Sequence, residues 1–226
     1  MNKSIIYTFI KWSVRFVLFF FSLIFIILLL TKWINPPITT VILSESISLD
    51  QKVNQEWRII EKIGKNVILT VLASEDSNFC NHYGFDFNEI FRAKEKGFSR
   101  GASTISQQVS KNLILWRERS WFRKGLEALI TIMIETLWSK KRILEIYLNI
   151  AETGNGYFGI QAISNSLFKK NSYDLTLKEA SYIAVTLPNP KKRNAKKLSI
   201  NLKKRAESVR NGANTLRLDG RASCVL

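Results

Sequence analysis

The sequence predicts an all-α domain that follows one membrane-spanning helix, and three observations indicate this class. Residues 16–31 carry no charge and are nearly all Phe, Leu and Ile. The rest of the 226-residue chain divides into apolar helical segments separated by polar turns, with no convincing series of strands. Hydrophobic residues make up 46% of the chain, which is enough to build the core of one domain.

The uncharged run has the features of a membrane anchor. About 20 residues span a bilayer, and the long flanking cations Arg15 and Lys32 can extend a slightly short run. Trp12 and Trp33 lie where an interfacial aromatic belt is expected. Basic residues gather before the run, so the N-terminus is expected in the cytoplasm and the remainder outside. A cleaved signal peptide is the alternative, but residues 35–37 (Asn-Pro-Pro) replace a small-residue cleavage site and favour a retained anchor.

The net charge of +16 indicates an anionic partner. Nucleic acid, an anionic membrane surface and a phosphorylated substrate all have this character. The anchor argues against nucleic acid and favours membrane phospholipid or a lipid-linked diphosphate. The two cysteines, Cys80 and Cys224, can pair but do not amount to a disulfide framework.

The expected organisation has three parts. Residues 1–34 form the cytoplasmic N-terminus and anchor, residues 35–54 an extended linker rich in proline and β-branched residues, and residues 55–220 the domain. The segment 121–138 is apolar almost all round and is expected to be buried. Helices are expected over residues 55–64, 66–76, 87–98, 105–115, 121–138, 140–151, 157–167, 176–187 and 196–218.

Glu75 is the first candidate for acid–base chemistry. Val71 and Leu72 lie four and three positions before it, so it continues the apolar face of its helix. Partial desolvation raises the pKa of a carboxyl group and suits it to general base or acid work. An ordinary helix end followed by a polar turn is the alternative.

His82 is the only histidine of the chain and lies close to Glu75. A single histidine makes a Ser-His-Asp triad or a histidine-based metal cluster unattractive. We therefore interpret His82 as a structural residue held by Asp86 or by the backbone.

Glu127 is the second candidate acid. Arg123 and Lys124 precede it by four and three residues, the spacing of an intrahelical salt bridge. A buried acid beside two cations also suits a site for an anionic leaving group. Glu135, further along the same helix, is interpreted as a structural acid.

Residues 101–112 place small hydroxyls and amides at the start of a helix, where Ser103 or Thr104 can act as the cap. Sugars and diphosphates both bind such donors, and a helix N-terminus adds positive potential. Arginines follow at 117 and 119, interleaved with aromatic residues, and their forked side chains match phosphate oxygens. The alternatives are an ordinary capped helix and a solvated basic face.

Taken in this order, the segments resemble the peptidoglycan glycosyltransferase family of the penicillin-binding-protein type. Its first motif is matched by Glu75, Asp76, Phe79, His82 and Gly84. Its second is matched by residues 101–108 with Lys111 and Asn112, its third by Arg123, Lys124 and Glu127, and its fourth by residues in 140–149. Segments 157–160 and 187–190 also fit, so the resemblance covers residues 57–190.

The resemblance implies a lysozyme-like helical fold with a small membrane-associated lobe. It implies an inverting enzyme that polymerises lipid II into β-1,4-linked glycan strands and releases undecaprenyl diphosphate. Glu75 would be the general base, and Glu127 would position the donor or balance its charge. The remaining site residues would bind substrate: Asp76, Phe79, His82, Gly84, Ser103, Thr104, Gln107, Gln108, Lys111, Arg119, Arg123 and Lys124.

The same resemblance implies no required cofactor and no protein-held metal, although Mg²⁺ or Mn²⁺ is compatible with diphosphates. Its implied partners are lipid II, the growing glycan strand, membrane phospholipid and other cell-wall synthesis proteins. The implied location is the bacterial inner membrane, with the domain in the periplasm. Two alternatives remain: a lysozyme-like glycan hydrolase, which also uses two carboxylates, and a non-catalytic scaffold for cell-wall enzymes.

Overall fold

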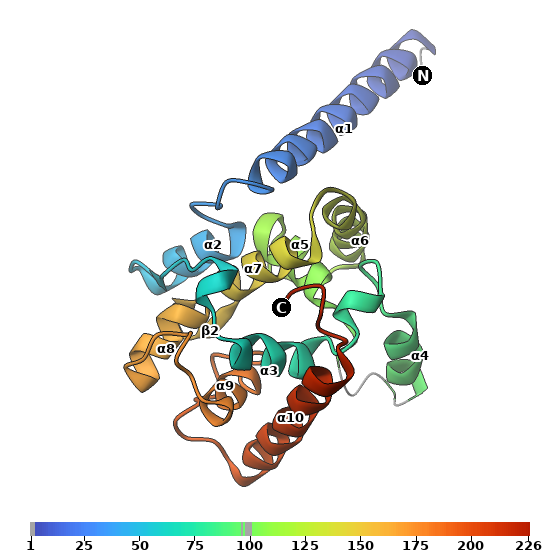
Figure 1. Ribbon diagram of the computed structural model, residues 1–226. Coiled ribbons are helices and arrows are strands. Elements are labelled where there is room, and N and C mark those ends of the chain that lie inside the picture. Colours follow the sequence, from blue (N-terminus) through green and yellow to red (C-terminus); the bar gives the residue numbers. More distant parts are fainter. Residues whose placement is uncertain (1–2, 96, 98–100) are drawn as a thin grey trace. The chain divides into compact units, whose positions relative to one another are not determined.

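The computed structural model describes residues 3–95, 97 and 101–226, which form two compact units (Figure 1). The first unit, residues 1–36, contains helix α1 (Lys3–Thr31). The second unit, residues 37–226, contains the other elements. The end expected at residue 98 for one helix lies outside the described residues.

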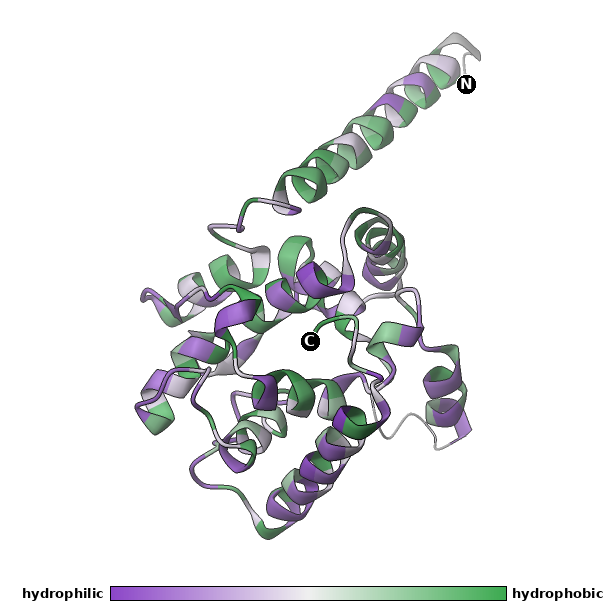
Figure 2. Cartoon of the chain, in the orientation of Figure 1, coloured by the Kyte–Doolittle hydropathy of each residue, from purple (hydrophilic) through white to green (hydrophobic). Residues whose placement is uncertain are grey.

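Helix α1 fits a single-pass membrane anchor. Within the described part of the chain, its residues 5–31 are the one helical stretch long and apolar enough to cross a membrane. Figure 2 colours most of this helix as hydrophobic. Arg15 lies over the Trp12 ring and Lys32 over the Trp33 ring, each 5.1 Å from the ring centre. Both ends of the apolar run thus carry the aromatic–cation pairs expected at an interface.

The prediction of an extended linker is wrong over residues 40–49, which form helix α2 (Thr40–Leu49). Thr39 caps it, because its hydroxyl accepts a hydrogen bond from the Ile42 backbone N–H at 3.3 Å. Val41 and Ile42 are buried in a cluster with Phe158. The cap and this burial outweigh the extended preference of the β-branched residues.

The remaining helices form the domain. Helix α5 packs against both α6 and α7, and α3 packs against α9 and α10 (Figure 1). All residues of 143–150 in α7 are buried, which places this helix in the core. A helix expected over residues 55–64 is only a short 3-10 turn at Ile60–Lys62. The bounds are α3 (Lys65–Glu75), α4 (Phe87–Glu95), α5 (Ile105–Ile114), α6 (Trp121–Leu137), α7 (Lys140–Ile150), α8 (Ile160–Phe168), α9 (Leu177–Ala184) and α10 (Ile200–Asp219).

A small sheet accompanies the helices and was not predicted. Its strands are β1 (Asn54–Gln55), β2 (Glu152–Gly154) and β3 (Tyr157–Phe158), in the order β1-β3-β2. β1 pairs with β3 in parallel, and β2 with β3 antiparallel. Strands this short show no alternating pattern, so sequence periodicity does not detect them.

Helix α6 is not buried all round, which corrects the sequence prediction. Its inward face carries four polar side chains at successive spacings of four: Arg123, Glu127, Thr131 and Glu135. Apolar residues instead face outward, with Leu129 and Ile132 each 49% exposed and Trp121 93% exposed. Ile130 and Ile134 are also fully buried, so the inward face of this helix is part polar and part apolar, and its outward face carries exposed apolar side chains.

The C-terminal segment is tied to the region that follows α3. Cys80 and Cys224 form a disulfide, with Cα atoms 5.8 Å apart. Ala222 and Val225 beside Cys224 are buried. Gly212 of α10 lies over Ala73, where an added Cβ would come within 3.3 Å of the Ala73 Cβ.

Candidate active site

Glu75 is the last residue of α3 and is half-buried. Its Oε2 accepts a hydrogen bond from Gln108 Nε2 at 3.1 Å, and its Oε1 accepts one from the Ser74 hydroxyl at 3.3 Å. Burial raises the pKa of Glu75, although Gln108, Ser74 and the charge of Arg205 oppose the rise. The direction agrees with the apolar stripe that leads into this residue.

Tyr147 of α7 sets the orientation of the Gln108 amide. Its hydroxyl donates to Gln108 Oε1 at 3.3 Å, which leaves the amide nitrogen to donate to Glu75. Burial, with the nearby charges of Glu75 and Asp76, raises the pKa of Tyr147 well above its usual value. The phenol therefore stays protonated and remains a donor.

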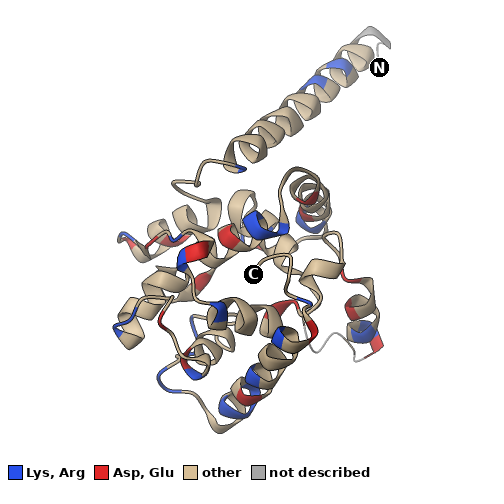
Figure 3. Ribbon diagram, in the orientation of Figure 1, with Lys and Arg blue, Asp and Glu red and all other residues tan. Residues whose placement is uncertain are grey.

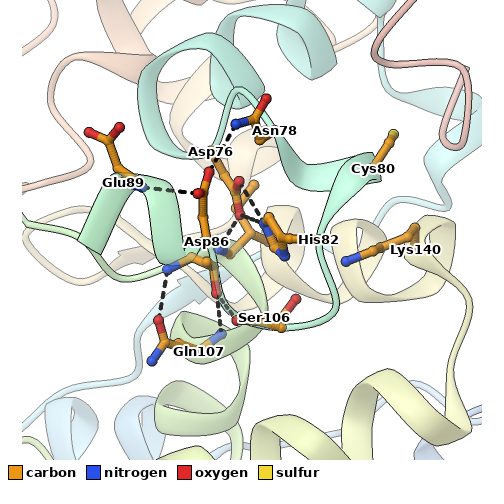
Figure 4. Close-up of polar contacts among 12 residues, drawn as sticks. Asp76, Asn78, Cys80, His82, Asp86, Glu89, Ser106, Gln107 and Lys140 are labelled. Atoms are coloured by element: carbon orange, nitrogen blue, oxygen red, sulfur yellow. Dashed lines mark hydrogen bonds and ion pairs between the residues drawn. The ribbon is translucent and has the colours of Figure 1, made fainter. Parts of the chain in front are cut away.

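Asp76, not Asp86, holds His82 (Figure 4). His82 Nε2 lies 2.9 Å from Asp76 Oδ1, and Asp76 Oδ2 accepts from the Ile105 N–H at 2.9 Å. Asp86 instead accepts hydrogen bonds from the Glu89 N–H and from Asn78. The prediction that His82 is structural fits this geometry, but the predicted partner was wrong. The pair ties the loop after Glu75 to the start of α5.

Thr104 and Gln107 form the capping box of α5. The Thr104 hydroxyl donates to the Gly84 carbonyl at 2.6 Å, and Gln107 Oε1 accepts from the Thr104 N–H at 3.1 Å. Both side chains are therefore engaged in the cap. The prediction that they line a substrate cleft does not hold for the cleft described next, whose lining contains neither of them. Gly84 has φ +86°, and an added Cβ would lie 2.8 Å from Thr131, so both conformation and space require glycine here.

A cleft of about 220 Å³ lies beside Gln108. Helices α5 and α7 supply one group of its lining residues, and the rest come from Val41 of α2, the segment from the end of α7 to the start of β2, and the loops after α5 and α9. Its polar lining is formed by Gln108, Lys111, Asn112, Arg117, Tyr147 and Glu152.

Glu127 makes the intrahelical salt bridges that its spacing predicted. Its Oε2 lies 2.8 Å from Arg123 Nη1, and its Oε1 bonds Lys124. The Lys124 ammonium also donates to the Ser103 hydroxyl at 3.4 Å. Glu127 and Arg123 are both buried, whereas Arg119 is exposed on the loop before α6.

Lys111 is a half-buried cation in the lining of the cleft. Burial lowers its pKa, Glu127 opposes this effect, and the charges of Arg123, Arg117 and Lys124 add to it. Lys111 forms no ion pair with any residue that the structure describes. An anionic ligand would supply the missing counter-charge.

Two further predicted residues have structural contacts. Glu135 accepts from the Ser106 hydroxyl and from Lys140, so it is the structural acid expected. Phe79 is buried, and Lys140 lies 4.5 Å from the centre of its ring.

Sequence reasoning did not identify Glu152, Glu45 or Lys191, which lie at or behind the cleft wall. Glu152 lies three residues after the end of the fourth motif, and this closeness was the available signal. Glu45 lay in the supposed linker, and Lys191 is one of many lysines near the C-terminus. No local pattern distinguishes either of them.

The site combines a desolvated carboxylate, a buried second acid with two cations, and a polar cleft that holds a cation without an ion-pair partner. In the described residues, no three His, Cys, Asp or Glu side chains are grouped to hold a metal ion. This arrangement is typical of a helical enzyme that combines acid–base chemistry with the binding of an anionic group.

The comparisons identify the family within that class. The transglycosylase family model matches residues 42–214. A biosynthetic peptidoglycan transglycosylase of Mannheimia succiniciproducens is 42% identical, over 97% of this chain and 94% of its own length. Proteins with the same name from Jannaschia sp. and Pseudomonas syringae are each 43% identical, over 84% and 82% of this chain and 79% and 82% of their own lengths. The chain belongs to the transglycosylase family and is a glycosyltransferase with a lysozyme-like helical domain.

Proposed function

We propose that this protein polymerises lipid II into β-1,4-linked glycan strands, with release of undecaprenyl diphosphate, in cell-wall biosynthesis. The observation that carries the proposal is the raised pKa of Glu75 beside a cleft that contains Lys111. A raised pKa is what a general base for a sugar hydroxyl needs, and a cation such as Lys111 is what a diphosphate leaving group needs. The names of the relatives agree with this activity.

In the proposed reaction, Glu75 takes the proton from the 4-hydroxyl of the acceptor sugar. The oxygen attacks the anomeric carbon of the growing strand, whose bond to the diphosphate breaks. Attack opposite the leaving group inverts the linkage from α to β. Gln108 keeps one Glu75 oxygen bonded, so the carboxylate is already oriented when substrate arrives.

The diphosphate negative charge is balanced by Lys111, Arg119, Arg123 and Lys124. Glu127 keeps two of these cations in place through its salt bridges. No cofactor enters these steps. Mg²⁺ or Mn²⁺, if it contributes, would bind the substrate diphosphate, and a comparison of rates with EDTA and with added cation tests this.

The proposed location is the inner membrane, with the N-terminus in the cytoplasm and the domain in the periplasm. The basic residues before the apolar run support the orientation. The Cys80–Cys224 disulfide supports it independently, because disulfides persist in oxidising compartments. The outward apolar residues of α6 would rest on the membrane surface, within reach of a lipid-linked substrate. Other cell-wall synthesis proteins are proposed partners.

Incubation of the full chain in detergent with labelled lipid II tests the proposal. We expect glycan polymer from the unaltered chain and at least 100-fold less from Glu75→Gln, since general base catalysis contributes roughly 10²–10⁴-fold. Glu118→Gln, an exposed acid outside the cleft, is the matched control and should keep full activity. Shortening of finished glycan without polymer formation would show a hydrolase. Lack of either activity would favour the scaffold alternative.

A further inference from the structure

Two hydrogen bonds in series connect the core helix α7 to the carboxylate of Glu75. Tyr147 Oη lies 3.3 Å from Gln108 Oε1, and Gln108 Nε2 lies 3.1 Å from Glu75 Oε2. Tyr147 is 1% exposed and belongs to the stretch 143–150 of α7, in which every residue is buried. Packing therefore fixes the phenol ring, whereas Gln108 is half-buried and lines the cleft. The Gln108 amide is thus the part of this series that has room to rotate.

The Gln108 amide has two orientations, which differ by a half-turn about its last side-chain bond. Either its NH2 group or its carbonyl oxygen faces Glu75. The observed orientation suits an ionised Glu75, because a carboxylate only accepts hydrogen bonds. A protonated Glu75 has a donor of its own, which the carbonyl oxygen of the turned amide can accept. Protonation of Glu75 therefore removes its preference for the NH2 group.

Tyr147 opposes this half-turn whatever the charge on Glu75. In the observed orientation the Tyr147 hydroxyl donates to the Gln108 carbonyl, which is the one hydrogen-bond acceptor it has among the described residues. After a half-turn the hydroxyl would face the NH2 group and would lose that acceptor. A buried donor without an acceptor is costly in free energy. Because the pKa of Tyr147 is raised well above its usual value, the phenol keeps its proton and remains a donor.

We propose that Tyr147 is a positioning residue that keeps the NH2 group of Gln108 directed at Glu75 while Glu75 takes up and releases the proton of the acceptor sugar. The inference rests on the proposed function, in which this proton moves from the 4-hydroxyl to the Glu75 carboxylate. A turned amide would accept a hydrogen bond from the protonated acid and stabilise it. That form cannot act as a base, so Tyr147 favours the return of Glu75 to the carboxylate.

Tyr147→Phe tests the proposal, because it removes only the hydroxyl. The other groups that act on the pKa of Glu75 stay in place: Ser74 and Arg205 lower it, and Asp76 raises it. We expect the acid limb of the polymerisation rate to move up by about 0.5–1 pH unit, the effect of one lost neutral hydrogen bond. On that limb kcat should fall about 3- to 10-fold, with a smaller change in KM. Well above the limb the two chains should converge, since an ionised Glu75 keeps the amide in place by itself.

Two further variants separate this role from structural support. In a Gln108→Ala background, Tyr147→Phe should move the acid limb no further, because the hydroxyl acts through the amide. Tyr173→Phe removes the hydroxyl of a 63% exposed tyrosine outside the cleft lining and should match the unaltered chain. An unmoved acid limb in Tyr147→Phe, even with a lower Tm, would overturn the proposal. So would an equal shift with and without Gln108.

A measurement without substrate distinguishes this proposal from the proposed function. The gain in Tm from Glu75→Gln should grow with pH and level off above the pKa of Glu75 in the folded chain. Tyr147→Phe should move this levelling to higher pH by the same amount as the acid limb, and no movement would count against Tyr147. Failure of the unaltered chain to polymerise lipid II would overturn the proposed function instead, and the Tm series would then decide the role of Tyr147.

Discussion

At the scale of single residues, the proposed general base Glu75 is a carboxyl group kept in an environment that resists its ionisation. Burial raises the pKa of Glu75, while hydrogen bonds from Gln108 and Ser74 limit the rise. A base must be ionised to act, yet a base of higher pKa accepts protons more readily. The pKa of Glu75 is thus set by burial, which raises it, and by hydrogen bonds from α3 and α5, which both lower it.

The pH dependence of activity should report this tuning. We expect kcat/KM to fall as pH decreases through the pKa of Glu75, at a pH above the ordinary carboxyl value of 4.5. Gln108→Ala removes a contact that lowers the pKa, so its acid limb should move to higher pH. Polymerisation rates across a pH series measure the acid limb of the variant and of the unaltered chain. Glu118→Gln should reproduce the unaltered profile. Coincident limbs for Gln108→Ala and the unaltered chain would contradict the assignment.

Ionisation of Glu75 should lower the stability of the folded domain. Because its pKa is raised in the folded state, the stabilising contribution of Glu75 is full below pH 4.5 and is lost as pH rises through the raised pKa. Glu75→Gln removes the cost of burying an ionised carboxylate, so it should raise Tm at neutral pH while abolishing activity. Below pH 4.5 the difference should vanish. Thermal unfolding at the two pH values measures it, and an equal Tm difference at both would contradict the desolvation account.

At the scale of elements, two helix caps of the same kind have different consequences. Thr104 with Gln107 caps α5, and Thr176 with Glu179 caps α9. Helix α5 carries Gln108 and Lys111, and the Thr104 hydroxyl also bonds the Gly84 carbonyl. No residue of α9 itself lines the cleft.

Removal of each cap separates stability from function. Thr104→Ala should cost about 2 kcal/mol, from a lost cap and one further hydrogen bond, and should reduce polymerisation. Thr176→Ala should cost about 1 kcal/mol and leave polymerisation unchanged. Denaturant unfolding and the lipid II assay measure the two effects. Thr104→Ser, which keeps the hydroxyl, should restore both stability and activity, and failure to do so would exclude the capping explanation.

At the scale of the whole molecule, the C-terminal segment is covalently joined to the first site motif. The disulfide closes a loop with a sequence separation of 144 residues, and α10, which packs along α3, ends just before it. Figure 3 shows the basic residues distributed along α10, including the part beside α3. Arg205 of this helix acts electrostatically on Glu75, so the end of the chain contributes to the site environment.

Reduction of the disulfide should destabilise the domain. Chain-entropy arguments give about 4–5 kcal/mol for a loop of this length. Thermal unfolding with and without dithiothreitol measures the change. The double variant Cys80→Ser with Cys224→Ser should unfold at the Tm of the reduced chain and ignore the reductant. An unaltered chain whose Tm does not respond to reductant would show that the bond contributes nothing to stability.

The sequence by itself determined the parts of this protein that depend on neighbouring residues. The apolar run defines the anchor, helical spacing brings Arg123 and Lys124 to Glu127, and the stripe ending at Glu75 predicts the raised pKa. Ordered motifs indicated the family. Each of these signals lies within a few turns of helix, where geometry follows from periodicity.

Only the tertiary structure decided which distant groups meet. Gln108 reaches Glu75 across 33 residues, and Lys191 reaches Glu45 across 146. The segment predicted as a linker forms α2 because its apolar side chains pack against Phe158. The local sequence pattern does not reveal this partner. Tertiary packing also decided which face of α6 points inward, since Arg123, Glu127 and Glu135 are buried while Leu129 and Ile132 are exposed. Such contacts form when the folded chain brings remote segments together, and a linear pattern does not encode that pairing.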